Sequence, residues 1–293
     1  MQKRVKLIAN PISGGNARPK ICQVVRFLEE TGAQVELYLT GKSGDAAVEA
    51  AQSNADEFDL VIAAGGDGTL NEVANGLAGR GIPLAFIPLG TANVMALEMG
   101  VPTKVSAACR IAIEGEARPV WLAETAEYKF LMMAGLGFDA AAVRGVSSRL
   151  KRITGKFAYL VAALRAFIWF HPEPFTLITD EGVEIRAWHT IISNIRLYGG
   201  RFVMAPTAGL EKPGLVACIV DRPGRFALLF FWLRILFHER FFGAVRRVES
   251  VQFHLSAVNL PVQIDGDEFI ESPQHIRCVF GQLDLVFPRG KSK

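Results

Sequence analysis

The sequence predicts an α/β N-terminal domain with a parallel sheet, followed by a second domain resembling an antiparallel β-sandwich. Over residues 1–120, short apolar runs alternate with segments of helical spacing, an order typical of parallel strands joined by right-handed crossovers. After residue 120, short alternating runs dominate, as in antiparallel sandwiches. The chain has 293 residues, which is long for one core, so two domains are expected.

In the first domain the expected strands are 5–9, 34–39, 60–64 and 84–88, and the expected helices are 19–31, 45–52, 69–78, 93–99 and 104–114. The run from Leu60 to Ala64 is apolar throughout, which favours a strand buried on both faces. The helix that follows should begin at Thr69 or a neighbour, because the next apolar residues have helical spacing.

We expect an α/β domain at 1–120, to which the final segment 284–293 can return, and a β-rich domain at 121–283. Expected strands of the second domain are 121–125, 129–134, 175–179, 184–193, 216–220, 248–255, 262–264 and 277–287. Helical inserts are expected at 157–170 and 226–242. Because nothing in the sequence looks like a linker, the domains should meet tightly around a cleft.

Composition excludes several classes of protein. Half of the residues are apolar and 21% are charged, which argues against extensive disorder. A net charge of +3 does not argue for nucleic-acid binding. No stretch reaches the roughly 18 to 20 apolar residues that span a bilayer, and the N-terminus lacks a signal-peptide core. We therefore expect a cytoplasmic protein whose membrane contact is peripheral.

Residues 65–69 form the most informative segment. Gly65, Gly66 and Gly68 allow a ligand to approach the backbone closely, and a following helix N-terminus favours phosphate. Asp67 is unfavourable beside bare phosphate but suits Mg²⁺-bound phosphate. This combination predicts nucleotide-dependent phosphoryl transfer. The simpler alternative is a glycine-rich turn with a capping aspartate.

Polar and glycine residues follow two further expected strands, at 10–15 and 89–93, and ligands bind beyond the carboxyl ends of parallel strands. A Walker A loop is excluded, because Glu36 occupies its first glycine position. A dinucleotide fingerprint meets Asn71 where it needs its third glycine.

Several motifs together resemble the diacylglycerol kinase catalytic family, whose relatives include bacterial lipid kinases, sphingosine kinases and ceramide kinases. They lie at 10–15, 65–72, 88–93, 134–139, 193–200 and 263–267. The resemblance implies the two-domain fold of NAD kinases and diacylglycerol kinases, with ATP in the cleft and a lipid site in the β-rich domain.

The resemblance also implies roles for single residues. Asp67 would be catalytic and would bind Mg²⁺ with the ATP phosphates. The implied ATP-binding residues are Asn10, Ser13, Gly65, Gly66, Gly68, Thr69, Asn71, Glu72, Thr91 and Asn93. The family places a carboxylate base in an Asp-Gly-Glu turn. This chain has Asp267 at the Glu position, followed by Glu268, which stays open as the base; an ordinary hairpin turn is the alternative.

Two features lie outside this match. The family often has a metal-binding Asp where this chain has Pro213, so we expect only the catalytic Mg²⁺. The apolar insert 226–242 and nearby arginines (Arg240, Arg246 and Arg247) suit an interfacial helix on an anionic bilayer. Insert 157–170 would be its partner. The alternatives are two buried helices or the contact of a homodimer.

The sequence thus predicts an ATP- and Mg²⁺-dependent lipid kinase at the inner face of the membrane, converting diacylglycerol to phosphatidic acid. A ceramide or sphingoid base is the alternative acceptor. More distant alternatives are NAD kinase, which shares the Gly-Gly-Asp-Gly-Thr motif, and a non-catalytic lipid or nucleotide carrier.

Overall fold

The computed structural model describes residues 2–126, 128–138, 173–237, 239, 243–256, 260–269 and 273–290. The chain divides into two compact units. Unit 1 comprises Met1–Leu122, Gly199–Arg201 and Val279–Lys293, and unit 2 comprises Ala123–Tyr198 and Phe202–Cys278. The predicted fold class is confirmed, because unit 1 has a mostly parallel sheet with helices and unit 2 has antiparallel sheets.

Unit 1 is built on parallel strands in the order β2-β1-β3-β4. Their bounds are Arg4–Ala9 for β1, Gln34–Leu39 for β2, Leu60–Gly65 for β3 and Leu84–Pro88 for β4. Strand β18, His275–Phe287, lies beside β4, where Leu285 pairs with Leu84 in parallel. Every residue of β3 is buried, as its apolar sequence predicts.

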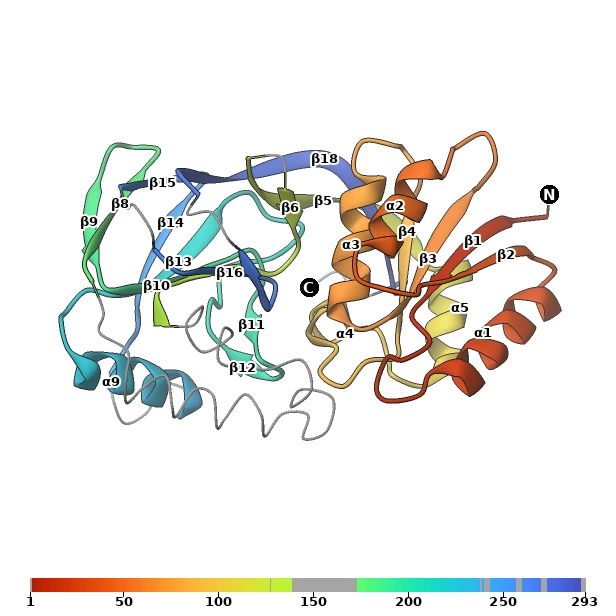
Figure 1. Ribbon diagram of the computed structural model, residues 1–293, viewed down its shortest axis with the longest axis horizontal. Coiled ribbons are helices and arrows are strands. Elements are labelled where there is room, and N and C mark those ends of the chain that lie inside the picture. Colours follow the sequence, from red (N-terminus) through yellow and green to blue (C-terminus); the bar gives the residue numbers. More distant parts are fainter. Residues whose placement is uncertain are drawn as a thin grey trace. The chain divides into compact units, whose positions relative to one another are not determined.

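Helices cover both faces of this sheet (Figure 1). Helices α1 (Arg18–Glu30) and α5 (Val105–Glu114) pack together on one face, and α2 (Asp45–Gln52) and α3 (Asp67–Leu77) pack together on the other. The short helix α4 spans Val94–Met99. Helix α3 begins two residues before the predicted Thr69, because Gly66 takes the extended N-cap conformation and Asp67 is already helical.

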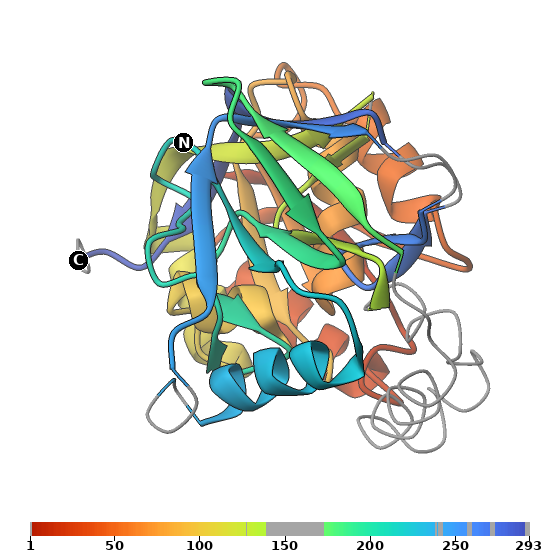
Figure 2. The same ribbon diagram turned by 90° about the vertical axis from the view of Figure 1, so that its left-hand side faces the viewer.

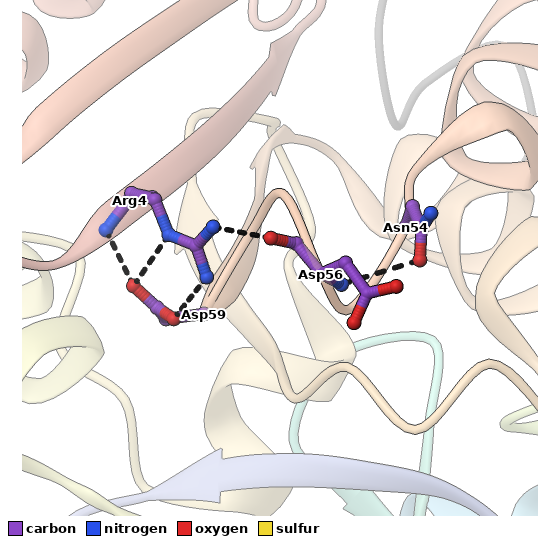
Figure 3. A network of polar contacts seen from close by, with 4 residues as sticks. All are labelled: Arg4, Asn54, Asp56 and Asp59. Carbon is purple, nitrogen blue, oxygen red and sulfur yellow. Dashed lines mark hydrogen bonds and ion pairs between the residues drawn. The ribbon is translucent and has the colours of Figure 1, made fainter.

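At the amino ends of the strands, a charged side-chain network ties β1 to the segment before β3 (Figure 3). The Arg4 guanidinium donates to both carboxylate oxygens of Asp59, at 2.8 and 3.3 Å, and to the carbonyl oxygen of Asp56. The amide of Asp56 donates to Asn54 Oδ1. The hydrogen bond from Arg4 holds the pKa of Asp59 at about 2, so this network stays ionised at neutral pH.

Unit 2 contains a six-stranded sheet in the order β14-β13-β10-β7-β16-β17. The bounds are Met133–Leu136 for β7, His189–Ser193 for β10, Leu215–Val220 for β13, Arg246–Ser250 for β14, Val262–Ile264 for β16 and Asp267–Phe269 for β17. The apolar core of unit 2 packs this sheet against β8 (Phe175–Thr179), β9 (Glu184–Ala187), β15 (Gln252–Ser256) and the start of β18. The remaining strands are β5 (Glu116–Thr125), β6 (Tyr128–Phe130), β11 (Leu197–Tyr198) and β12 (Phe202–Val203).

Three runs predicted as single strands each form two. Run 129–134 breaks at Leu131 and Met132, whose amides donate to Asp265. Run 184–193 breaks at Trp188 and run 248–255 breaks at Val251. At each of these three breaks the chain passes from one sheet to the other. A hydrophobic pattern does not reveal such a transfer, because both sheets face the same core.

Helix α9, Arg225–Leu236, lies against the six-stranded sheet (Figure 2). It ends at Leu236, with Phe237 as its C-cap, and is therefore shorter than the predicted insert 226–242, of which 238 and 240–242 lie outside the described residues. The predicted insert 157–170 also lies outside them. None of the described helices has both the length and the hydropathy required to cross a membrane.

Candidate functional site

Three loops meet at the carboxyl ends of β1, β3 and β4, which are neighbours in the sheet of unit 1. The amide of Asn10 donates to the carbonyl oxygen of Ala64 at 2.9 Å. The amides of Leu89 and Gly90 both donate to Gly65 O, at 2.7 and 3.1 Å. The segments 10–15, 65–69 and 89–93 are therefore joined by their backbones, as their positions in the sequence predict.

Close packing explains two glycines of this corner. A Cβ atom on Gly90 would lie 2.7 Å from the Cα atom of Gly66, and one on Gly65 would lie 2.5 Å from Thr69 Oγ1. Neither distance is compatible with a side chain. Gly68 differs, because a Cβ atom there meets no described atom within 4 Å, and its backbone is ordinary helix. The fold accounts for Gly65 and Gly90 but leaves space above Gly68.

Asp67 joins the second loop to the third. Its Oδ2 accepts a hydrogen bond from the amide of Val94 and its Oδ1 accepts one from the amide of Met95, each at 3.0 Å. Asp67 therefore caps the N-terminus of α4 from the first turn of a different helix. Burial raises the pKa of the Asp67 carboxyl, and the amides of Met95 and Val94 oppose that rise.

Asn93 holds the N-cap position of α4 but does not cap it. Its backbone is left-handed, with φ of 48°, and its Nδ2 donates to the carbonyl oxygen of Gly90 at 2.8 Å. Its Oδ1 is buried and has no hydrogen-bond partner among the described residues. Leaving a buried oxygen without a hydrogen-bond partner costs folding free energy. A ligand bound at the corner would remove that cost by pairing with Asn93 Oδ1.

The other predicted ATP-binding residues lie in different surroundings. Asn10 reaches Thr69 Oγ1 through its Nδ2 at 3.4 Å, and Ser13 is half-buried beside Gly66. Thr91 is exposed. Asn71 is buried on α3, and Glu72 accepts a hydrogen bond from Ser43, which lies between β2 and α2. The structure thus places Asn10, Ser13 and Asn93 at the corner that contains Gly65, Gly66, Gly68 and Thr69.

The donor chemistry of this corner fits Mg²⁺. Each carboxylate oxygen of Asp67 accepts one amide and keeps a lone pair, and Asn93 adds a buried amide oxygen. Mg²⁺ prefers such oxygen ligands, and it usually binds through one or two carboxylates plus substrate phosphates. The described residues hold no cluster of three or more His, Cys, Asp or Glu side chains, so phosphate oxygens would have to supply the remaining ligands.

A second Asp-Gly corner lies in unit 2, between β16 and β17. The Asp265 carboxylate accepts hydrogen bonds from the amides of Leu131, Met132 and Met133, at 2.8 to 3.3 Å. Its backbone is left-handed, with φ of 50°, and Gly266 follows with φ of 90°. Sequence reasoning missed this anchoring role of Asp265. The Asp-Gly pair signals a turn but does not say which distant amides the carboxylate will bind.

This anchored turn positions the two candidate bases. Asp267 pairs with Ile264, and Glu268 pairs with Gln263. Paired residues share a face of a sheet and successive residues alternate, so the two carboxylates project from opposite faces. Both residues are exposed. A hydroxyl bound on one face of this hairpin can therefore reach only one of them.

His189, a buried histidine of unit 2, was also not predicted from the sequence to be of interest. His189 Nδ1 donates to the carbonyl oxygen of Leu136 at 2.9 Å, while Nε2 has no partner among the described residues. The ring lies edge-on to Phe231 and close to Trp232, on the side of the sheet that α9 covers. Burial lowers the pKa of His189 to about 4, so the imidazole is neutral.

Comparison with known proteins identifies the family. Residues 4–125 match the model described as "Diacylglycerol kinase catalytic domain", and residues 133–287 match "YegS C-terminal NAD kinase beta sandwich-like domain". A diacylglycerol kinase of Mycobacterium tuberculosis is 31% identical over 98% of this chain and 96% of its own length. One of Bacillus subtilis is 37% identical over 71% of each chain.

Solved structures agree at the level of fold. A crystal structure of a diacylglycerol kinase from Bacillus anthracis has a TM-score of 0.79 at 24% identity, covering 98% of each chain. An NAD kinase from Archaeoglobus fulgidus, solved with ATP, has a TM-score of 0.51 at 17% identity, covering 98% of this chain and 94% of its own. Family models that together match most of the sequence, and a full-length relative, lead to one conclusion. This chain is a member of the diacylglycerol kinase family.

Proposed function

We propose that this protein transfers the γ-phosphoryl group of ATP to the primary hydroxyl of a neutral membrane lipid, with diacylglycerol as the acceptor and phosphatidic acid as the product. The observation that carries the proposal is the meeting of three loops around Asp67, with open space above Gly68. The relatives named diacylglycerol kinase support the choice of acceptor.

The corner of unit 1 suits the ATP phosphates. Phosphoryl transfer needs positioning and charge neutralisation more than covalent chemistry. The first turn of α3 presents amides at Gly68 and Thr69, and the absence of a side chain on Gly68 lets a phosphate approach them. Asp67 and Asn93 would hold Mg²⁺, which when bound neutralises phosphate charge.

The acceptor hydroxyl needs a base within hydrogen-bonding distance. We assign that role to Asp267, which would take the proton from the lipid oxygen as that oxygen attacks the γ-phosphorus atom and the bond from that phosphorus to the departing ADP breaks. Asp265 supports it indirectly, because its three amide contacts fix the turn from which Asp267 projects. The opposite orientation of Glu268 makes it the alternative base for a lipid bound on the other face.

Because the proposed acceptor is dissolved in a bilayer, we place the reaction at the cytoplasmic face of the membrane. A ceramide or sphingoid base presents the same primary hydroxyl and is the nearest alternative acceptor. NAD kinase is the more distant alternative, since a solved enzyme of that activity shares the fold.

An acceptor panel tests the proposal. The protein is incubated with radiolabelled ATP and either diacylglycerol, ceramide, sphingosine or NAD, the lipids in mixed micelles, with Mg²⁺ or with EDTA. We expect labelled phosphatidic acid that requires Mg²⁺, and no product with Asp67→Asn. Labelled NADP without a lipid product would replace the proposal, and a protein that turns over no ATP with any acceptor would be a carrier.

A further inference from the structure

Helix α9 carries two apolar faces. One packs on the six-stranded sheet through Leu228, Phe231 and Ile235, which are all buried. The Phe231 ring lies 5.4 Å from the His189 ring. This face is ordinary core and needs no partner outside unit 2.

The second face is exposed. Phe226, Leu229 and Leu236 are 75%, 37% and 50% exposed, and Phe230 and Phe237 are exposed to a similar degree. At about 100° per residue, these five positions and Leu233 form one stripe opposite the three buried residues. Single exposed apolar residues are normal on a protein surface, but a continuous stripe with no polar member marks an interaction surface.

Arginines border the stripe on both sides. Arg225 and Arg234 fall at its two edges on the helix, and Arg222 precedes the helix and is exposed. From Arg222 to Phe237 the sequence contains three arginines and no acidic residue. An apolar stripe between cationic edges is the pattern of a helix that lies in the plane of an anionic bilayer surface.

We propose that the stripe formed by Phe226, Leu229, Phe230, Leu233, Leu236 and Phe237 docks on the surface of an anionic lipid bilayer. The proposal rests on the proposed function, because that function requires the protein to reach a lipid acceptor. Charge selects the bilayer over a second copy of this chain. Two copies joined through this face would bring their arginines together, whereas anionic lipid headgroups neutralise them.

Vesicle flotation of the full-length protein tests the proposal. The vesicles contain phosphatidylcholine alone or phosphatidylcholine with phosphatidylglycerol, without diacylglycerol and without ATP. A triple variant, Phe226→Ser, Leu229→Ser and Leu236→Ser, should bind at least about tenfold more weakly, because three apolar anchors no longer enter the lipid. The matched control replaces three exposed valines outside the helix, Val48→Ser, Val183→Ser and Val251→Ser, and should bind like wild type.

A second variant tests the contribution of the arginines beside the stripe. Arg222→Gln with Arg225→Gln should weaken binding several-fold on vesicles with phosphatidylglycerol and leave the weaker binding to phosphatidylcholine unchanged. Added salt should remove the difference, because exposed charges are screened within about 8 Å at physiological ionic strength. Lys20→Gln with Arg26→Gln, which removes two exposed cations of α1, is the control.

Four outcomes separate this proposal from its rivals. Wild-type binding by the triple serine variant would overturn it, and so would a change from dimer to monomer in sedimentation with vesicle binding unaltered. Phosphorylation of a short-chain diacylglycerol in detergent micelles should survive the triple substitution. If α9 binds vesicles as expected while the wild-type protein phosphorylates no lipid, docking stands and the proposed function fails.

Discussion

The two Asp-Gly corners of this protein look alike in sequence and differ in structure. Asp67-Gly68 opens α3 in unit 1, and Asp265-Gly266 turns the chain between β16 and β17 in unit 2. In both corners the carboxylate accepts backbone amides from a segment far along the chain. Each aspartate therefore holds together two segments that the sequence keeps apart.

The glycines separate the two corners. Gly266 has φ of 90°, a conformation that side chains rarely adopt, so the turn itself requires glycine. Gly68 lies in ordinary helix with open space where a Cβ atom would stand. Conformation accounts fully for the unit 2 corner and leaves Gly68 unexplained. Open space beside a glycine that the backbone does not require is what a ligand site needs. Five experiments test this contrast between the two corners.

The largest expected effect comes from Asp67→Asn, which should abolish lipid phosphorylation while the protein stays folded. The change removes the charge proposed to hold Mg²⁺ and weakens the cap of α4, a loss of at most about 2 kcal/mol in unfolding free energy. Asp45→Asn is the matched control, because Asp45 also accepts two backbone amides, from Gly41 and Lys42. Asp45→Asn should remain folded and keep its activity. Near-normal turnover by Asp67→Asn would show that Asp67 has only a structural role in the unit 1 corner.

Asp267→Asn should lower kcat by about two to four orders of magnitude with little change in the KM for ATP, because only proton transfer in the transition state is lost. Glu268→Gln, on the opposite face of the same hairpin, should stay within about threefold of wild type if it touches no reacting atom. Steady-state kinetics with both substrates varied gives both quantities. The reverse pattern would move the base to Glu268.

Acid should weaken unit 2 before unit 1. His189 takes up a proton near pH 6.5 when unfolded and only near pH 4 when folded, so the unfolded state binds more protons between those values. The stability of unit 2 should fall by about 3 kcal/mol across that window. In unit 1, Asp59 starts to lose its contribution only below pH 3.8, toward its pKa of about 2. The raised pKa of Asp67 acts in the opposite direction, because its burial becomes less costly when it is protonated.

Hydrogen exchange of the amides of β10 and β3, followed from about pH 7 to about pH 5, reads the two units separately. His189→Phe should remove most of the pH dependence of β10. Equal loss of protection in both strands would show that the buried imidazole does not govern the response.

Asp265→Asn should destabilise unit 2 by about 2 kcal/mol, because a charged acceptor of three amides becomes a neutral one. Asparagine tolerates the left-handed backbone, so the change isolates the lost carboxylate from strain. Chemical denaturation measures the loss, and activity per folded molecule should fall far less than in Asp67→Asn. Complete inactivation of a folded Asp265→Asn protein would make the two corners functionally equivalent.

The smallest effects distinguish the two glycines. Gly266→Ala should cost about 1–2 kcal/mol through its left-handed φ. Gly68→Ala should change stability by less than about 1 kcal/mol, since its backbone suits any residue. Instead it should raise the KM for ATP several-fold, because the new methyl group occupies the proposed phosphate space. An unchanged KM would show that the space above Gly68 is not used.

Local pattern predicted the β3 corner well. The apolar run Leu60 to Ala64 and the helical spacing after it fall within β3 and α3, apart from small differences at the ends. The meeting of the loops was predictable too, because parallel strands place their carboxyl ends at one edge. These features depend on residues close together in the chain or on a general rule of sheet topology.

Contacts between distant residues were not predictable. No spacing connects Asp67 with the amide of Val94, or Asp265 with that of Leu131, and the second contact splits a run that looks like one strand. The all-round apolar sequence of α9 could not say which face packs on the sheet, because both faces carry the same residue types. In each case the deciding partner lies in another element.

Strand β18 has a consequence for how the chain folds during synthesis. Its later residues belong to unit 1, whose parallel strands β1, β2, β3 and β4 lie before residue 89, and Gln282 O accepts a hydrogen bond from the amide of Gly79. While the ribosome makes the nearly 200 residues between β4 and β18, the edge of β4 that will pair with β18 has no partner strand. The nascent N-terminal half is thus a sheet with an unpaired strand edge, and that sheet becomes complete only after β18 has left the exit tunnel.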